Sequence, residues 1–293
     1  MSKTKNYKKQ KKFGTKSSDN SILSKNFLIV LSIAVLLAFG IFLFLQAPSN
    51  KTPINTTIKS DTSNLSQPTS SSLPYLNPRA YITSSDPVIG NTSSKLTIIE
   101  FGDFQCPYCK TFYIEQLPLI KINYLDTNLA SFIYLNSPFP SLHDKSVDAS
   151  LAGFCAKEQN NFYQMHNLLF EKQDAWNRTH KELFNNMLLS YSKELNLNQS
   201  QFVSCLESKK YASELDAEIN ASMSLGVSGT PTFFILIQKD KIKGLDFQSK
   251  FDQIRSNSVS GFALTPYQNE KDYVIVISGF VDYKTLKAVL DIN

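Results

Sequence analysis

The chain has 293 residues, of which 42% are hydrophobic and 12% aromatic, enough to build a sizeable core and to exclude disorder throughout. Its net charge of +5 suggests a nucleic-acid partner until the charges are located. Eight lysines and one aspartate precede residue 26 and give that segment +7, so the rest of the chain carries −2. The folded part therefore offers no evident surface for nucleic acid.

A basic tail and an apolar run open the chain. Residues 1–26 are rich in Lys, Ser and Asn and lack periodic apolar positions, which predicts a disordered cytoplasmic tail. Residues 27–45 are uncharged and almost wholly apolar, and as a helix they would span about 28 Å, close to the hydrocarbon thickness of a bilayer. Because the lysines precede this run, we expect a single-pass membrane protein with a cytoplasmic N-terminus and an extracytoplasmic domain.

A cleaved signal peptide is the alternative for this segment. Its apolar region should be shorter, about 7–15 residues, and Leu45-Gln46-Ala47 is a weak match to a cleavage site. Residues 46–80 are rich in Ser, Thr, Asn and Pro, which predicts a flexible linker to a domain at 81–293. Outside the cytoplasm, this domain can form disulfides.

The domain begins with a pattern typical of a βαβ unit. In residues 95–101 the apolar positions Leu96, Ile98, Ile99 and Phe101 follow one another too closely for an edge that faces water, which predicts a buried strand. Helical spacing follows from Pro107 to Tyr124, where Pro118 predicts a kink or break, and residues 131–135 form a second strand. Two strands joined by a helix predict a parallel pair with a right-handed crossover.

A change of periodicity then marks an inserted helical subdomain at about 145–224, for which we expect three to five helices and no strand. Apolar runs at 233–237 and 273–278 predict two more strands, and residues 283–290 a closing helix. Residues 239–272 between these strands form a further insertion. Its apolar positions predict a short amphipathic helix, namely Leu245, Phe247, Phe251 and Ile254.

Cys106-Pro107-Tyr108-Cys109 lies between the first strand and the first helix. Backbone N–H groups and the helix dipole favour a thiolate at the start of a helix, so Cys106 is the candidate nucleophile. Cys109 lies one turn further on and can attack a mixed disulfide formed at Cys106. A zinc site uses the same spacing, but no second cysteine or histidine pair follows. We expect neither a metal nor another cofactor.

Four motifs in this order resemble the DsbA-like thiol:disulfide oxidoreductases of the thioredoxin superfamily. They are Ile-Ile-Glu-Phe-Gly-Asp-Phe-Gln-Cys-Pro-Tyr-Cys at 98–109, the helical insertion, Gly-Thr-Pro-Thr-Phe-Phe at 229–234, and the terminal Ile-Ser-Gly-Phe with the closing helix. The resemblance covers roughly residues 80–293. It implies an α/β thioredoxin fold interrupted by a helical subdomain, here preceded by a transmembrane helix.

The resemblance also implies roles for five residues. Cys106 corresponds to the exposed nucleophile and Cys109 to the buried resolving thiol. Pro231 corresponds to the cis-proline loop, which offers backbone groups to an extended substrate segment, and Thr230 is placed to touch the sulfur of Cys106. Glu100 matches the acidic residue beneath the active site, where it would accept or relay the proton of Cys109.

The implied function is a membrane-anchored enzyme that forms disulfides in cysteine-containing substrate proteins and is re-oxidised by a membrane partner of the DsbB or vitamin-K-epoxide-reductase type. Two features depart from the family pattern. The Pro-Tyr dipeptide lacks the histidine of the strongly oxidising members, and the insertion at 239–272 replaces a tight hairpin. Alternatives are a disulfide reductase or isomerase, and a peptide-binding, chaperone-like module.

The remaining candidates have ordinary structural explanations. Cys155 and Cys205 lie on apolar helix faces and are either buried free thiols or, as an oxidising compartment and an even count favour, a structural disulfide. His143 and His166 lack an arrangement with cysteine or carboxylate and are predicted to be structural. Asp103 is expected to shape the turn before the first helix.

Overall fold

The computed structural model describes residues 74–242, 244, 246–258 and 263–292. All described residues belong to one compact unit, Pro68–Asn293. The predicted basic tail, the apolar run at 27–45 and most of the predicted linker lie outside the described residues. Among the helices that are described, none is long and apolar enough to cross a bilayer.

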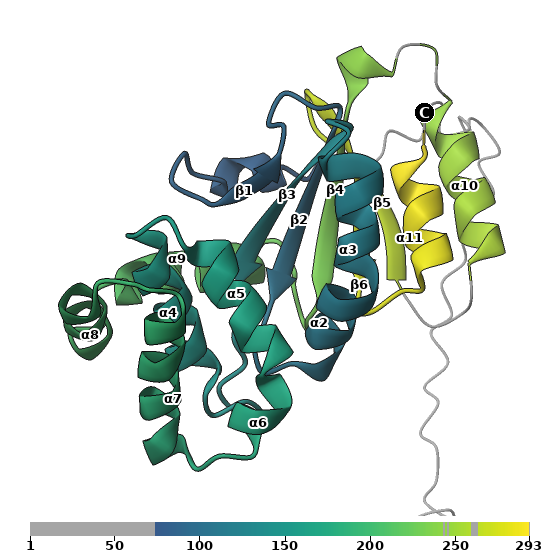
Figure 1. The fold of residues 1–293 in the computed structure, drawn as a ribbon. Coiled ribbons are helices and arrows are strands. Elements are labelled where there is room, and N and C mark those ends of the chain that lie inside the picture. Colours follow the sequence, from purple (N-terminus) through teal and green to yellow (C-terminus); the bar gives the residue numbers. More distant parts are fainter. Residues whose placement is uncertain (1–73, 243, 245, 259–262, 293) are drawn as a thin grey trace, which may run out of the picture. The chain divides into compact units, whose positions relative to one another are not determined.

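A mixed sheet runs through the domain, with its six described strands in the order β1-β3-β2-β4-β6-β5 (Figure 1). β2 and β3 are parallel, which confirms the predicted βαβ unit, and all other neighbouring pairs are antiparallel. The strands are β1 (Val88–Gly90), β2 (Leu96–Gly102), β3 (Ala130–Asn136), β4 (Thr232–Gln238), β5 (Ala263–Gln268) and β6 (Asp272–Ser278).

The two faces of the sheet bury different elements. Ile98, Phe132 and Phe233 face the helical run after β2, the closing helix α11 (Tyr283–Leu290) and the insertion. Ile99 and Phe234 face the opposite way, toward apolar side chains at the end of α9 (Ala212–Ser224) and around the short helix η1 (Pro78–Tyr81). This alternation follows from the two-residue period of a strand and produces a core on each side.

The helical run after β2 continues past Pro118, so of the kink or break predicted there, the break does not occur. Pro118 stands at the start of a short α-helical segment, where a residue without an N–H is tolerated, and π-helical turns flank that segment. In order, the segments are α2 (Pro107–Thr111), η2 (Phe112–Gln116), α3 (Leu117–Ile120) and η3 (Lys121–Leu125).

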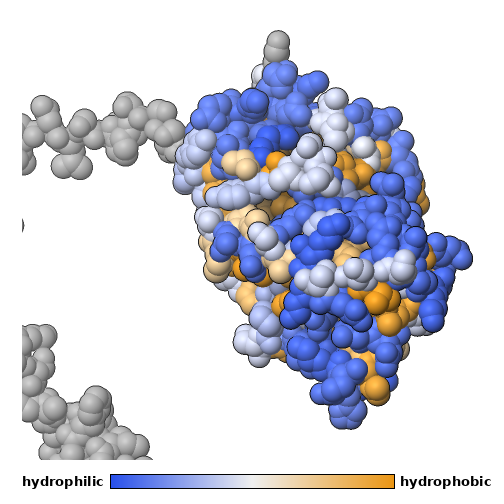
Figure 2. Space-filling view, turned by 90° about the vertical axis from the view of Figure 1, so that its left-hand side faces the viewer, coloured by the Kyte–Doolittle hydropathy of each residue, from blue (hydrophilic) through white to orange (hydrophobic). Residues whose placement is uncertain are grey.

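The helical insertion between β3 and β4 is confirmed, but it contains six helices rather than three to five across residues that are all described. They are α4 (Ser146–Lys157), α5 (Phe162–Glu171), α6 (Gln173–Asn177), α7 (Lys181–Glu194), α8 (Gln199–Glu207) and α9. Figure 2 shows the side of the molecule on which they lie, where hydrophilic residues predominate and apolar residues form separate patches. The apolar faces of these helices are therefore mostly turned inward.

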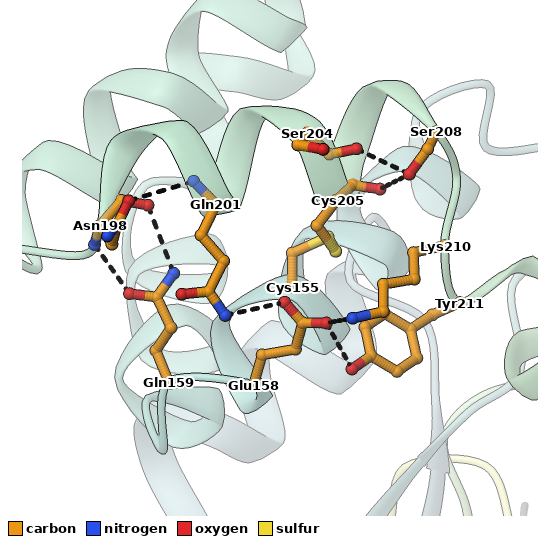
Figure 3. The surroundings of a disulfide bond; sticks show 10 residues. All are labelled: Cys155, Glu158, Gln159, Asn198, Gln201, Ser204, Cys205, Ser208, Lys210 and Tyr211. Atoms are coloured by element: carbon orange, nitrogen blue, oxygen red, sulfur yellow. Dashed lines mark hydrogen bonds and ion pairs between the residues drawn. A yellow bond between two sulfur atoms is a disulfide. The ribbon is translucent and has the colours of Figure 1, made fainter.

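A disulfide joins Cys155 of α4 to Cys205 of α8, two positions 50 residues apart in the sequence. Both cysteines are buried. Figure 3 shows the bond between the two helices, with Glu158 beside it accepting hydrogen bonds from Gln201, Lys210 and Tyr211. The bond and this polar cluster fasten the outer helix α8 to α4.

The segment 239–272 contains both a predicted and an unpredicted element. After η4 (Lys239–Lys241), the predicted amphipathic helix is α10 (Phe247–Asn257), which buries Phe247 and Phe251, while Leu245 lies outside the described residues. β5 was not predicted because Pro266 interrupts its pattern. A proline is tolerated there because β5 is an edge strand of the sheet.

Candidate active site

The cysteine pair lies where β2 passes into the helical run. A turn in which Asp103 O accepts the N–H of Cys106 at 3.0 Å places Cys106 directly before α2, with Pro107 as the first helical residue. Cys109 is completely buried, and only 5% of the Cys106 surface is accessible. The expectation that Cys106 is exposed is therefore wrong in this structure. The loop that contains Thr230 and Pro231, called the Thr230 loop below, lies against the Cys106 sulfur.

Hydrogen bonds around Cys106 favour its thiolate. The bond from Sγ–H to Thr230 O, at 3.3 Å, forms only with the protonated thiol, whereas the bonds that lower the pKa are donated to the sulfur. Hydrogen bonding with Cys109 has the largest effect, and together with Thr230 and the backbone N–H groups of Cys109 and Tyr108 it lowers the pKa of Cys106 to about 6, against the opposing effect of burial. Cys106 is therefore mostly ionised at neutral pH.

Cys109 has the opposite properties. Burial first, and then its hydrogen bond with Cys106 and the nearby charges, raise the pKa of Cys109 well above its ordinary value. The two thiols are not bonded to each other in the structure. Their pKa values are shifted in opposite directions, and thiol–disulfide exchange uses this difference. Cys106 is the better attacking and leaving group, and Cys109 holds its proton.

The Thr230–Pro231 bond is cis, and this loop begins β4. Gly279 N donates to Pro231 O at 2.8 Å, which ties the loop to the end of β6. Thr230 thus contacts a cysteine 124 positions earlier, as the resemblance implied. The pairing of β2 with β4 produces this contact, because Phe101 lies opposite Thr232 in the sheet.

Glu100 lies on the same face of β2 as Ile98, toward the cysteine-bearing helix, and is almost fully buried as predicted. Its Oε1 has no hydrogen-bond partner among the described residues. Burial, and next the charge of Cys106, raise the pKa of Glu100 well above its ordinary value. Since Glu100 also acts electrostatically on Cys109, it can hold a proton close to the buried thiol.

We expect Glu100→Gln to become more stabilising as the pH rises. A carboxyl whose folded pKa is raised contributes its full stability below the unfolded pKa and loses it as the pH rises toward the folded pKa, by up to about 1.4 kcal/mol per pH unit. Glutamine cannot lose this proton. Urea unfolding of the disulfide form at pH 4 and pH 8 should show a variant advantage that grows with pH, whereas an equal difference at both would contradict the burial argument.

Asp103 does more than shape the turn, because its buried carboxylate organises two loops. Oδ1 accepts the N–H of Gln105 at 2.8 Å, whereas Oδ2 accepts the N–H of Phe139 at 2.9 Å and lies 2.8 Å from Nδ1 of His143. The prediction that His143 has no carboxylate arrangement is therefore wrong. The two partners are 40 residues apart, so no local spacing indicates their contact.

His166 fits its predicted structural role. It is buried among aromatic rings, and burial lowers its pKa to about 4, so it is neutral at physiological pH. Between the two cysteines, Tyr108 is 60% exposed, and its ring lies 6.4 Å from that of Phe280. Across the described residues, no group of three or more His, Cys, Asp or Glu side chains is arranged to hold a metal ion.

A sequence profile of the family described as Thioredoxin matches residues 83–250. The chain belongs to this family, and the resemblance to its DsbA-like members is confirmed. Two solved structures share the fold. Wolbachia pipientis alpha-DsbA1 is 20% identical with a TM-score of 0.55, covering 72% of this chain and 91% of its own, and oxidised BdbD of Bacillus subtilis is 22% identical with a TM-score of 0.53, covering 75% and 96%.

Several curated relatives match about half of this chain. A Rickettsia typhi protein named "Putative protein-disulfide oxidoreductase" is 27% identical over 53% of this chain and 56% of its own length. Disulfide bond formation protein D of Bacillus subtilis is 24% identical over 51% and 67%. A Na(+)/H(+) antiporter NhaA 3 of Salinispora tropica is 31% identical over 51% of this chain but only 21% of its own length. The match thus spans little over half of the first relative and about a fifth of the last.

Proposed function

We propose that the protein is a thiol:disulfide oxidoreductase that introduces disulfides into other proteins through Cys106 and Cys109. The observation that carries this proposal is the contrast between the two thiols. Cys106 stands before α2 against the Thr230 loop and is readily ionised, whereas Cys109 is fully buried behind it and keeps its proton. The names of the Rickettsia and Bacillus relatives support the same chemistry.

The reaction starts from the disulfide form. A substrate thiolate attacks Sγ of Cys106, the Cys106–Cys109 bond breaks, and its electron pair passes to the sulfur of Cys109. Glu100, whose raised pKa favours its protonated form, provides the proton that the buried Cys109 sulfur takes up. A second substrate thiolate then attacks the substrate sulfur of the mixed disulfide, and Cys106 leaves as a thiolate. The substrate loses two electrons and the Cys106–Cys109 pair gains them.

The Thr230–Pro231 loop serves as the substrate contact in this proposal. It lies directly against Cys106, so a substrate segment that reaches the sulfur must pass beside it. The exposed ring of Tyr108 and the partly buried ring of Phe280 beside it extend the same surface and favour apolar side chains around the substrate cysteine. Such contacts suit an extended, unfolded chain rather than a finished fold.

The proposal includes a location and a partner. Residues 1–26 form a cytoplasmic tail, 27–45 a membrane anchor and 46–80 a linker, so the domain at 81–293 acts outside the cytoplasm. The positive segment before the apolar run supports this arrangement, and so does the Cys155–Cys205 bond, because disulfides form and persist in oxidising compartments. A membrane partner of the DsbB or vitamin-K-epoxide-reductase type re-oxidises the cysteine pair.

A single-turnover experiment tests the activity. The oxidised protein is mixed with a reduced, unfolded protein that contains two cysteines, and the free thiols of both are counted over time. We expect the substrate to lose two thiols for each pair that Cys106 and Cys109 gain, and Cys106→Ala to lose this reaction. Undiminished disulfide formation by Cys106→Ala would rule out the enzyme and leave the alternative, a peptide-binding module in which the cysteines are incidental.

A further inference from the structure

The Pro-Tyr dipeptide between the cysteines provides no positive charge to stabilise the Cys106 thiolate. A histidine side chain nevertheless lies beside this turn, on the loop between β3 and α4. Nδ1 of His143 is 2.8 Å from Oδ2 of Asp103, and 21% of the His143 side chain is exposed. Asp103 belongs to the turn that positions Cys106, since its backbone carbonyl accepts the N–H of Cys106.

The His143 loop is fixed to this turn at several points. Oδ2 of Asp103 also accepts the N–H of Phe139, before the histidine, and Oε1 of Gln105 accepts the N–H of Lys145, after it, at 2.7 Å. The carbonyl of His143 accepts the hydroxyl of Ser146 at the start of α4. The imidazole therefore has a defined position relative to Cys106 rather than that of a free surface side chain.

The surroundings of His143 favour its charged form. The hydrogen bond with Asp103 raises its pKa most, burial opposes this, and the charges of Asp103, Cys106 and Asp144 raise it further. The neighbouring cation, Lys145, pairs with Asp144. An interaction between two charges is reciprocal, so a Cys106 thiolate that stabilises the imidazolium is stabilised by it to the same extent.

We propose that His143, held in place by Asp103, supplies the positive charge that stabilises the Cys106 thiolate. It is a positioning residue that acts through Cys106, and this role rests on the proposed function of the same site. Asp103 is completely buried, and its carboxylate oxygens also accept the backbone N–H groups of Gln105 and Phe139, which do not depend on the imidazole. Removal of His143 would take away the positive charge and leave a buried negative charge next to the thiolate. Both effects disfavour ionisation of Cys106.

The first test measures the ionisation of Cys106 in the reduced full-length protein and requires no substrate. Cys109 ionises at higher pH, so the pH dependence of Cys106 alkylation, located by peptide mass, reports Cys106 alone. We expect His143→Gln to lower the ionisation constant of Cys106 by about threefold to tenfold. His143→Lys, which keeps a cation, should restore most of it.

The matched control is His180→Gln, because His180 is exposed before α7 and its side chain makes no cap hydrogen bond. It should leave the ionisation of Cys106 unchanged. Equal ionisation constants for His143→Gln, His143→Lys and the unchanged protein would overturn the proposal. A loss in His143→Gln that His143→Lys does not recover would assign His143 a purely structural role and would also overturn it.

A second measurement uses the unchanged protein and therefore does not depend on the folding of a variant. The chain has only three histidines, so the His143 ring can be followed by NMR as the pH is varied. We expect His143 to titrate at higher pH in the dithiol form, where Cys106 is a thiolate, than in the disulfide form. Identical titration in the two forms would contradict the coupling. A coupling without any substrate oxidation would instead contradict only the proposed function.

Discussion

Cys109→Ser is expected to convert a transient mixed disulfide into a stable covalent complex. Cys106 remains a reactive thiolate in this variant and can still attack a disulfide-bonded peptide, but no buried thiol is left to release it. Because the lost step is intramolecular, we expect the complex to persist about a thousandfold longer or more. Mass spectrometry without reducing agent should detect one peptide per protein molecule, linked at Cys106.

The matched control for this experiment is Cys106→Ser, which removes the thiol with the lowered pKa and retains the buried one. It should form no complex within the same time. Equal complex formation by both variants, or a peptide linked at Cys109 in Cys106→Ser, would contradict the assignment of the two thiols. The comparison is sharp because the two cysteines are only three positions apart and the substitutions are identical.

Removal of the second cysteine pair is expected to have the largest effect on stability. The Cys155–Cys205 bond closes a loop between positions 50 residues apart, for which loop-closure entropy predicts a contribution of about 4 kcal/mol. We therefore expect Cys155→Ala combined with Cys205→Ala to lower the free energy of unfolding by about this amount in urea. The effect should begin in the insertion, because the bond attaches α8 to α4.

Both proteins should be compared with the Cys106–Cys109 pair oxidised, so that only the structural bond differs. We expect the double variant to retain disulfide exchange at temperatures where it remains folded, because Cys155 and Cys205 lie in α4 and α8, outside the hydrogen bonds that surround Cys106. An unchanged midpoint in urea would show that the bond does not contribute to stability. Loss of exchange in the folded variant would indicate a role beyond the structural one.

The fold was predictable from the sequence where the signal is local and strong. The continuous apolar runs of β2, β3, β4 and β6 and the long helical patterns are recognisable from hydrophobic periodicity alone. β1 was missed because three residues carry too little pattern, and β5 because Pro266 argues against a strand. At Pro118 the error was the opposite one, because a break was predicted where the helix continues. A proline at the start of a helical segment does not end the helix.

The site was predictable in its residues but not in its full electrostatics. Cys106, Cys109 and Glu100 lie close together in the chain, and the Thr230–Pro231 motif reaches them through ordinary strand pairing. The pairing of Asp103 with His143 depends on how the loop after β3 folds back onto the turn, and no spacing in the sequence encodes that contact. The accessibility of Cys106 was overestimated for the same reason, because the covering loop comes from elsewhere in the chain.

The direction of electron flow follows from the stability of the Cys106 thiolate. A stabilised thiolate favours the dithiol form, which makes the disulfide form an oxidant. The pKa of Cys106, about 6, lies below that of an unperturbed thiol, and the buried Cys109 provides no second stabilised thiolate. The protein should therefore oxidise more strongly than thioredoxin, although less strongly than a site with a histidine between its cysteines.

The reduction potential of the Cys106–Cys109 pair tests this most directly. The protein is equilibrated with glutathione mixtures of known composition, and the fraction of bridged pairs is read by mass after alkylation. We expect a value between about −230 and −120 mV, on the oxidising side of thioredoxin and near the range of proteins that donate disulfides. A value at or below about −270 mV would contradict the account and would indicate a reductase.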